Sequence, residues 1–286
     1  MNKTGKAIFH AVLAAALYAI NAPVSKLLLI EIPSTMMAGL LYLGAGVGMY
    51  LLEKLNRHRE ELPLTRQELP YTIAMVVLDI AAPVFLMIGL LRCSAANASL
   101  LNNFEIVATS LIALFIFKEA IGKKLWMAIL LVTLASILLS FEDMSSLQFS
   151  RGSVFVLLAC VCWGFENNCT RMLSSKNPAQ IVIIKGFGSG LGALLLSFCT
   201  GERYTNWGYI LLAMLLGFVA YGLSIYFYIY AQRDLGAAKT STYYAISPFI
   251  GAGVSLLLFR ELPSAVFIIA LLLMAAGTYF ASISEG

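Results

Sequence analysis

Long apolar stretches follow one another along the whole chain, separated by short polar segments. Each stretch approaches the ~20 consecutive apolar residues that a helix needs to cross a bilayer. The pattern therefore predicts ten transmembrane helices, joined by connections too short to hold a soluble domain. The ten stretches cover residues 7–29, 34–52, 70–91, 95–117, 123–140, 152–173, 179–198, 206–231, 237–258 and 264–282.

The composition agrees with an all-α integral membrane protein. The chain is 60% hydrophobic and 12% charged, whereas soluble domains carry about 25% charged residues. The first stretch is too long, and too polar at its end, for a cleaved signal peptide, so we expect it to remain as a helix. The net charge of +4 does not require a nucleic-acid partner, because the orientation in the membrane explains it.

The chain also repeats itself. The segment Tyr18–Lys26 has the same order of aromatic, polar and basic residues as Trp163–Arg171, 145 positions later. Glycines 44, 46 and 48 match glycines 188, 190 and 192, and Phe117–Glu119 matches Phe259–Glu261. We therefore predict two repeats of five helices each, in residues 1–141 and 151–286. Such doubling in a membrane protein is typical of transporters, whose site lies where the repeats meet.

Basic residues are distributed unevenly between alternate loops. If the N-terminus is cytoplasmic, thirteen of the 19 lysines and arginines lie in inner segments, five lie at outer ends, and Lys185 lies within a helix. The positive-inside rule then favours both termini in the cytoplasm, with residues 53–68 as the main inner loop. The expected location is the plasma (inner) membrane. Because five is an odd number, the second repeat would enter the membrane inverted.

Taken in order, four motifs carry a family resemblance: Ala38–Gly46, Ser99–Glu105, Phe117–Glu119 and Trp163–Arg171. The chain resembles the ten-helix, EamA-type members of the drug/metabolite transporter (DMT) superfamily, which have two EamA repeats. The resemblance implies a secondary active transporter of a small metabolite or drug-like solute. It also implies a central cavity lined by helices 1, 3, 4, 6, 8 and 9, with helices 5 and 10 at the periphery. It does not select a substrate, because the superfamily moves amino acids, nucleotide sugars, cations and drugs.

Three carboxylates fall inside the predicted helices: Asp79, Glu105 and Glu166. A charge at that depth costs several kcal/mol, so such groups rarely lack a function. Burial favours the neutral form of a carboxylate, which lets it exchange protons at physiological pH. A proton and a cationic substrate could then compete for one group, which is a minimal antiport mechanism. The residues do not fix the direction of transport, and of the two directions we expect export. The alternative is that the carboxylates only hold helices together, with Thr170 and Arg171 as partners of Glu166.

Lys185 lies about six residues, or ~9 Å, from the inner end of the seventh helix. At that depth we expect its ammonium group to extend to the lipid headgroups. The alternative is an ion pair with a cavity carboxylate, which would weaken the proton-coupling hypothesis. The glycines at 44, 48, 186 and 190 have a structural interpretation, since small residues four apart allow helices to pack closely.

The remaining polar and aromatic side chains of the predicted cavity indicate the class of substrate. Aromatic faces beside carboxylates attract organic cations, and Lys185, the only firmly intramembrane base, is expected outside the cavity. The substrate is therefore predicted to be a small cationic or zwitterionic solute. Tyrosines near helix ends could instead form interfacial belts. The candidate cavity residues are Asn21, Asn102, Trp163, Asn167, Tyr221 and Tyr244.

Other classes of protein fit less well. An enzyme is not expected, because the chain carries none of the familiar nucleophile, metal or phosphate-binding motifs. No cofactor is expected, and with only two histidines a zinc site with the cysteines is improbable. An uncoupled permease or channel for a small polar solute is the main alternative. The expected partners are the solute, protons and the lipid bilayer, with no nucleic acid, and a homodimer is left open.

Overall fold

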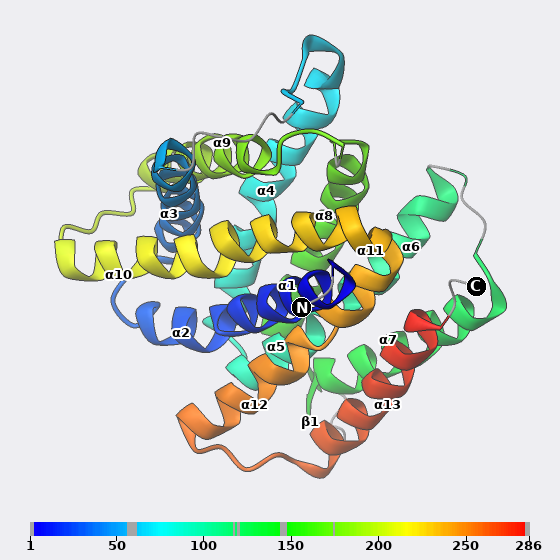
Figure 1. Cartoon of the computed structure of the whole chain (residues 1–286). Helices are drawn as coiled ribbons and strands as arrows, with labels where there is room; N and C mark the ends of the chain where they lie inside the picture. Colours follow the sequence, from blue (N-terminus) through cyan, green and yellow to red (C-terminus); the bar gives the residue numbers. More distant parts are fainter. Residues whose placement is uncertain are drawn as a thin grey trace.

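The computed structural model describes residues 3–55, 62–116, 118, 121–143, 148–173 and 175–283. It is a bundle of helices in which the first and second halves of the chain intermingle (Figure 1). Within the described ranges, nine helical segments are long and apolar enough to span a membrane, and a shorter apolar helix covers Ser247–Phe259. The predicted all-α architecture with ten membrane helices is therefore confirmed.

The first half of the chain builds the first five predicted helices. Two of them are split into consecutive segments, and a 3₁₀ turn at Arg66–Glu68 precedes the third. The segments are α1 (Lys3–Ala19), α2 (Asn21–Leu28), α3 (Ser34–Leu55), α4 (Leu69–Leu90), α5 (Ala95–Leu101), α6 (Phe104–Phe115) and α7 (Lys123–Ser140).

The second half follows after a short antiparallel hairpin, β1 (Phe141–Asp143) and β2 (Gln148–Phe149). Its eighth predicted helix contains a π-helical stretch at Phe218–Leu223. The segments are α8 (Arg151–Leu173), α9 (Pro178–Cys199), α10 (Trp207–Gly217), α11 (Ser224–Tyr244), α12 (Ser247–Phe259) and α13 (Ala265–Ser282).

One break in the helices occurs at related places in the two halves. The fourth predicted helix is interrupted at Asn102–Asn103, between α5 and α6, and the chain turns again at Ala245–Ile246, between α11 and α12. The expected loop between residues 231 and 237 was wrong, because α11 continues through it to Tyr244. Its polar residues are mostly good helix formers, so their polarity alone does not end the helix.

Glycines bring helices of opposite halves into backbone contact, as their spacing indicated. A Cβ atom on Gly186 of α9 would lie 2.3 Å from the Cα of Gly46 of α3, and one on Gly217 would lie 1.9 Å from the carbonyl oxygen of Leu41. No larger residue fits at such distances without moving a helix. Helix α3 is therefore fixed directly against both α9 and α10.

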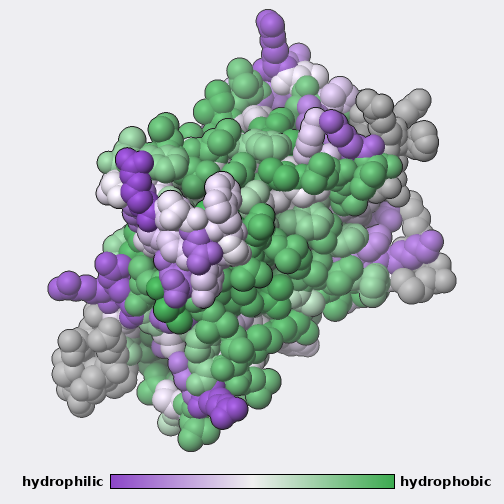
Figure 2. Space-filling model, turned by 90° about the vertical axis from the view of Figure 1, so that its left-hand side faces the viewer, coloured by the Kyte–Doolittle hydropathy of each residue, from purple (hydrophilic) through white to green (hydrophobic). Residues whose placement is uncertain are grey.

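The face formed over α3, α9 and α10 is largely hydrophobic, with polar atoms gathered in a few places (Figure 2). Large apolar side chains on this side are exposed, which suits contact with lipid tails rather than with water. They include Leu51, Leu191, Leu195, Leu211 and Leu215.

The end of the bundle away from the chain termini is tied by two charged side chains. Lys26 of α2 donates hydrogen bonds to the carbonyl oxygens of Leu90 and Cys93, where α4 ends. Glu202 accepts a hydrogen bond of 2.9 Å from the backbone N–H of Met36, near the start of α3. Both contacts place a charge where the helix dipole favours it, and they hold this end closed.

Two parts of the sequence predictions lie outside the described residues. They are positions 56–61 of the expected inner loop, and Phe117 and Glu119 of the repeated motif.

Candidate functional site

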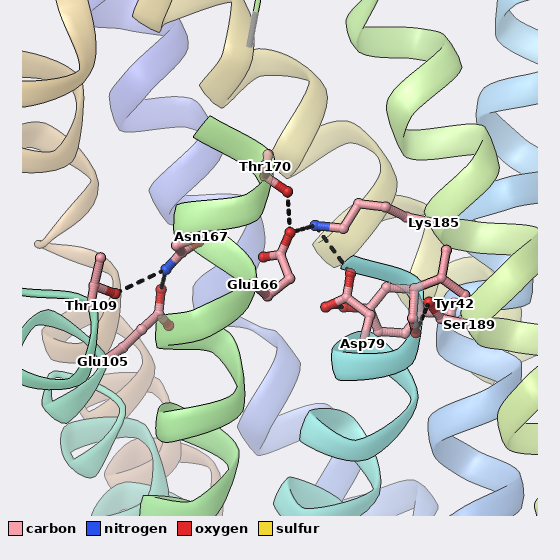
Figure 3. Close-up of polar contacts among 10 residues, drawn as sticks. Tyr42, Asp79, Glu105, Thr109, Glu166, Asn167, Thr170, Lys185 and Ser189 are labelled. Atoms are coloured by element: carbon pink, nitrogen blue, oxygen red, sulfur yellow. Dashed lines mark hydrogen bonds and ion pairs between the residues drawn. The ribbon is translucent and has the colours of Figure 1, made fainter. Parts of the chain in front are cut away.

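The site forms around α8, which carries Glu166 and Asn167 side by side in its sequence. Neighbouring residues on a helix point about 100° apart, so the two side chains turn to different neighbours. Glu166 faces α9 and α4, and Asn167 faces α6 (Figure 3). The helix therefore links two polar groups on either side of it.

The first polar group joins two carboxylates through one lysine. The Nζ atom of Lys185 donates a hydrogen bond of 2.8 Å to Oε1 of Glu166 and lies 3.2 Å from Oδ2 of Asp79. Thr170 donates to the same Glu166 oxygen, and the hydroxyl of Tyr42 donates to Oδ1 of Asp79 at 2.8 Å. The cluster connects α3, α4, α8 and α9.

The position of Lys185 corrects two expectations. Its side chain does not extend to the headgroups, because the residue is only 3% exposed and its ammonium is held by Glu166 and Asp79. It also lines the cavity rather than lying outside it. The close approach of Gly186 to Gly46 explains this, since it draws α9 towards the centre of the bundle.

The second polar group surrounds Glu105 on α6. Asn167 donates a hydrogen bond of 2.5 Å to Oε1 of Glu105 and a longer one of 3.3 Å to the hydroxyl of Thr109. Asn168 also bonds across the same helix pair, to the carbonyl oxygen of Thr109. Within the described part of the chain, no basic side chain forms an ion pair with Glu105. Glu105 is thus held by an amide rather than neutralised by a charge.

Aromatic rings gather at the end of the cavity that adjoins Asn21 and Asn102. The ring of Tyr221 lies 4.9 Å from that of Tyr42 and 5.8 Å from that of Tyr18, measured between centroids. Tyr18 also contacts Trp163 edge-on at 6.5 Å and Tyr244 at 6.1 Å. These rings come from α1, α3, α8, α11 and the π-helical stretch, so they form an aromatic cluster contributed by both halves.

A cavity of about 410 Å³ connects the two polar groups and the aromatic cluster. Its lining also includes Ala113 near the end of α6, Leu125 near the start of α7 and Ser282 at the end of α13. The cavity therefore extends to the end of the bundle at which the chain begins and ends. A much smaller space of about 10 Å³ adjoins the cavity beside Tyr18 and Asn102, and it is lined by Asn21, Ser99 and their neighbours.

Most of the predicted site residues lie on the cavity wall. Asn21 is the exception: it lies in the small adjoining space and donates a hydrogen bond of 3.0 Å to the hydroxyl of Tyr221. The residues on the wall are Asp79, Glu105, Glu166, Asn102, Trp163, Asn167, Tyr221 and Tyr244.

The cavity wall also contains residues and helices that were not anticipated. Tyr42 of α3, Lys185 of α9 and Thr278 of α13 all contribute to it, so the lining is wider than the expected six helices. Thr109, which accepts a hydrogen bond from Asn167 beside Glu105, was also not predicted. It lies four residues after Glu105 on the same helix face, and this spacing could have indicated that the two side chains are neighbours. Among the described residues, no group of three or more His, Cys, Asp or Glu side chains is placed to hold a metal ion.

Comparison with known proteins settles the family. The model of the EamA-like transporter family matches residues 5–141 and again residues 150–283. The chain belongs to the EamA-like transporter family. This EamA-like protein is also 24% identical over 265 residues to an uncharacterized transporter of Methanothermobacter thermautotrophicus, covering 85% of the chain and 76% of that relative. The predicted membership of the superfamily is confirmed.

The fold of this EamA-like transporter is shared with a protein of known crystal structure. The two superpose with a TM-score of 0.73, over 98% of this chain and 97% of the other, at 14% sequence identity. At such a low sequence identity, the match shows a shared fold and nothing about function. The family and the relative's description indicate a multi-pass membrane transporter.

Proposed function

We propose that this EamA-like transporter is a secondary active exporter of the plasma membrane, which exchanges a small organic cation or zwitterion for protons. The observation that carries the proposal is Glu105, a carboxylate on the cavity wall held by the amide of Asn167 at 2.5 Å. Since no described base forms an ion pair with it, its charge is left for a ligand to neutralise. A proton or a cation could do so.

The proposed mechanism follows from competition at this carboxylate. Glu105 is half-buried on the cavity wall, where its charge is less well hydrated than in bulk water, so binding of a proton or of a positively charged solute would stabilise it. Each ligand stabilises the conformations in which it is bound best, and thereby shifts the balance between inward-open and outward-open forms. Protons entering from one side and solute from the other then exchange, without a separate coupling device.

The proposed substrate class rests on the aromatic cluster as well as on charge. Tyr18, Trp163 and Tyr244 line the same cavity as the carboxylates, and aromatic rings attract ammonium groups by about 0.5–2 kcal/mol each. The volume of about 410 Å³ is that of a small-molecule site. Lys185 does not reverse the preference for cations, because its ammonium is shared between Asp79 and Glu166.

The direction of transport depends on the orientation in the membrane. With both termini in the cytoplasm, as the basic residues favour, the cavity would extend to the cytoplasmic side and receive solute from the cell. The contacts of Lys26 and Glu202 would then hold the outer side closed. This arrangement supports loading from the cytoplasm, the first step of export.

The experiment uses the purified protein in liposomes with an imposed pH gradient and a trapped pH-sensitive dye. Small amines and, separately, carboxylated and phosphorylated metabolites are added, and proton flux driven by each solute is recorded. We expect amines to drive proton flux in the wild type. A Glu105→Gln variant should insert normally, because its amide oxygen can still accept the bond from Asn167, but it should lose the flux.

The matched control is Glu31→Gln, the same change at an exposed residue away from the cavity, which should transport normally. Glu166→Gln should also lose pH-dependent transport, but it disturbs Lys185 and so is the less selective variant. Wild-type pH dependence in both cavity variants would refute proton coupling. Solute movement without proton flux would identify an uncoupled permease, and misfolding of Glu105→Gln would show that the carboxylate only holds α6 to α8.

A further inference from the structure

The contacts of Lys185 differ from those of an ordinary buried ion pair. One ammonium is placed between two carboxylates, 2.8 Å from Glu166 and 3.2 Å from Asp79. All three residues are almost fully enclosed, with exposed fractions of 3%, 3% and 0%. Two acids therefore share one base inside the protein, next to the cavity that the substrate is proposed to occupy.

Asp79 gives an independent indication that this is a place for a cation. Its Oδ2 atom is buried and accepts no hydrogen bond from any described residue, although it faces the ammonium at 3.2 Å. Its other oxygen is occupied by Tyr42. A buried carboxylate oxygen that is contacted by an ammonium and by no other described donor is what a site for an ammonium group requires.

The lysine side chain is itself a primary ammonium on an alkyl chain. It is anchored by helix α9, which the Gly46–Gly186 contact holds against α3. Tethered in this way, the ammonium is present at the two acids in every molecule, at a high effective concentration. A free amine could bind at the two acids only by displacing the ammonium of Lys185, which cannot diffuse away.

We infer that Lys185 is a specificity-determining residue that permanently fills a second cation site formed by Asp79 and Glu166. The inference deepens the proposed function, since it assigns the first site, at Glu105, to the ammonium of the substrate. With the second site filled, the transporter accepts solutes that carry one positive charge and has no place for the second charge of a diamine. Removal of Lys185 opens that place.

The test compares two probes, pentylamine and diaminopentane, which share a carbon chain and differ in one ammonium group. Binding to the purified protein is measured by calorimetry in Lys185→Gln and in the wild type. Lys6→Gln, the same change at an exposed lysine of α1, is the matched control. We expect Lys185→Gln to bind the diamine at least about tenfold more tightly than the wild type does, with little change for pentylamine, while Lys6→Gln behaves as wild type.

The Lys185→Gln variant is expected to be less stable, because removing one partner of a buried ion pair leaves an uncompensated charge. A second variant that keeps the charge balanced is therefore tested as well. Asp79→Asn/Lys185→Gln removes one acid and one base together, so the formal charge of the cluster is unchanged. It leaves Glu166 open beside Glu105 and should also gain affinity for the diamine. If neither variant folds alone, diaminopentane added during purification should restore folding, because it replaces the missing ammonium.

The outcomes separate this inference from the proposed function. If pentylamine binds the wild type through Glu105 but neither Lys185 variant gains diamine affinity, the filled second site is wrong and the proposed function stands. If pentylamine does not bind the wild type while the variants gain the diamine, the second site stands and the assignment of Glu105 fails. Failure of diaminopentane to restore folding, when both variants misfold without it, would also overturn the inference.

Discussion

Substituting Gly186 by alanine tests the contact that places α9, and with it Lys185, at the centre of the protein. The added Cβ atom would lie 2.3 Å from both the Cα and the N atom of Gly46. Non-bonded carbon atoms normally approach to 3.5–4.0 Å, so α9 would have to move away from α3 by more than about 1 Å. Overpacking of this kind costs about 1–3 kcal/mol.

The expected fall in melting temperature follows from that range. At about 2–4 °C for each kcal/mol, Gly186→Ala should melt roughly 2 to 12 °C below the wild type, as measured by thermal unfolding in detergent. The displacement would also lengthen the contact of 2.8 Å between Lys185 and Glu166, because Lys185 precedes Gly186 directly.

Gly253→Ala is the matched control, since it makes the same change in a helix where the new Cβ meets nothing within 4 Å. Alanine is favoured over glycine inside a helix by about 0.5–1 kcal/mol, so this variant should melt at or slightly above the wild-type temperature. If Gly186→Ala melted no lower than Gly253→Ala, the backbone contact between α3 and α9 would be refuted, and with it our explanation of why Lys185 is buried.

Three further predictions concern the ends of the bundle and the aromatic cluster. Lys26→Met should lower stability by about 1–3 kcal/mol, because it removes charged donors from the carbonyls at the end of α4; an unchanged melting temperature would contradict this. Tyr221→Phe should cost about 1–3 kcal/mol, since the buried amide of Asn21 loses its acceptor, and a neutral effect would show that the bond contributes nothing. Reporter fusions should place both termini and residues 53–68 in the cytoplasm, and an external loop would overturn the assigned orientation.

The membrane helices and the doubling were readable from sequence because both depend on local pattern. Apolar runs of the required length mark helices wherever they occur, and the paired glycines mark close packing whatever their partner. The breaks were harder to anticipate. Asn102 and Asn103 interrupt a helix without proline or glycine, and the polar stretch after Ala231 continues one. In neither place does the apolar pattern mark the boundary, because that pattern records which residues avoid water rather than which residues favour a helix.

The candidate site shows the same division. Asp79, Glu105 and Glu166 were found from sequence because charge within an apolar run is conspicuous. The burial of Lys185 between two carboxylates could not be predicted. The sequence gives the depth of this residue along its helix but not the rotation or position of that helix. A lysine has a chain long enough to reach either headgroups or a carboxylate. Tyr42 gave no signal, because a tyrosine among small and apolar residues looks like packing.

Trp163, which contacts Tyr18 edge-on, can serve as an intrinsic fluorescent probe of the cavity. Of its three tryptophans, Trp126 and Trp207 are 47% and 75% exposed on the outside of the bundle, whereas Trp163 is 6% exposed and lines the cavity. A solute entering the cavity alters the polarity around Trp163 and leaves the other two indoles in their surroundings. Intrinsic emission can therefore follow occupancy of the cavity in the unlabelled protein, with the Trp163→Phe variant as the silent reference.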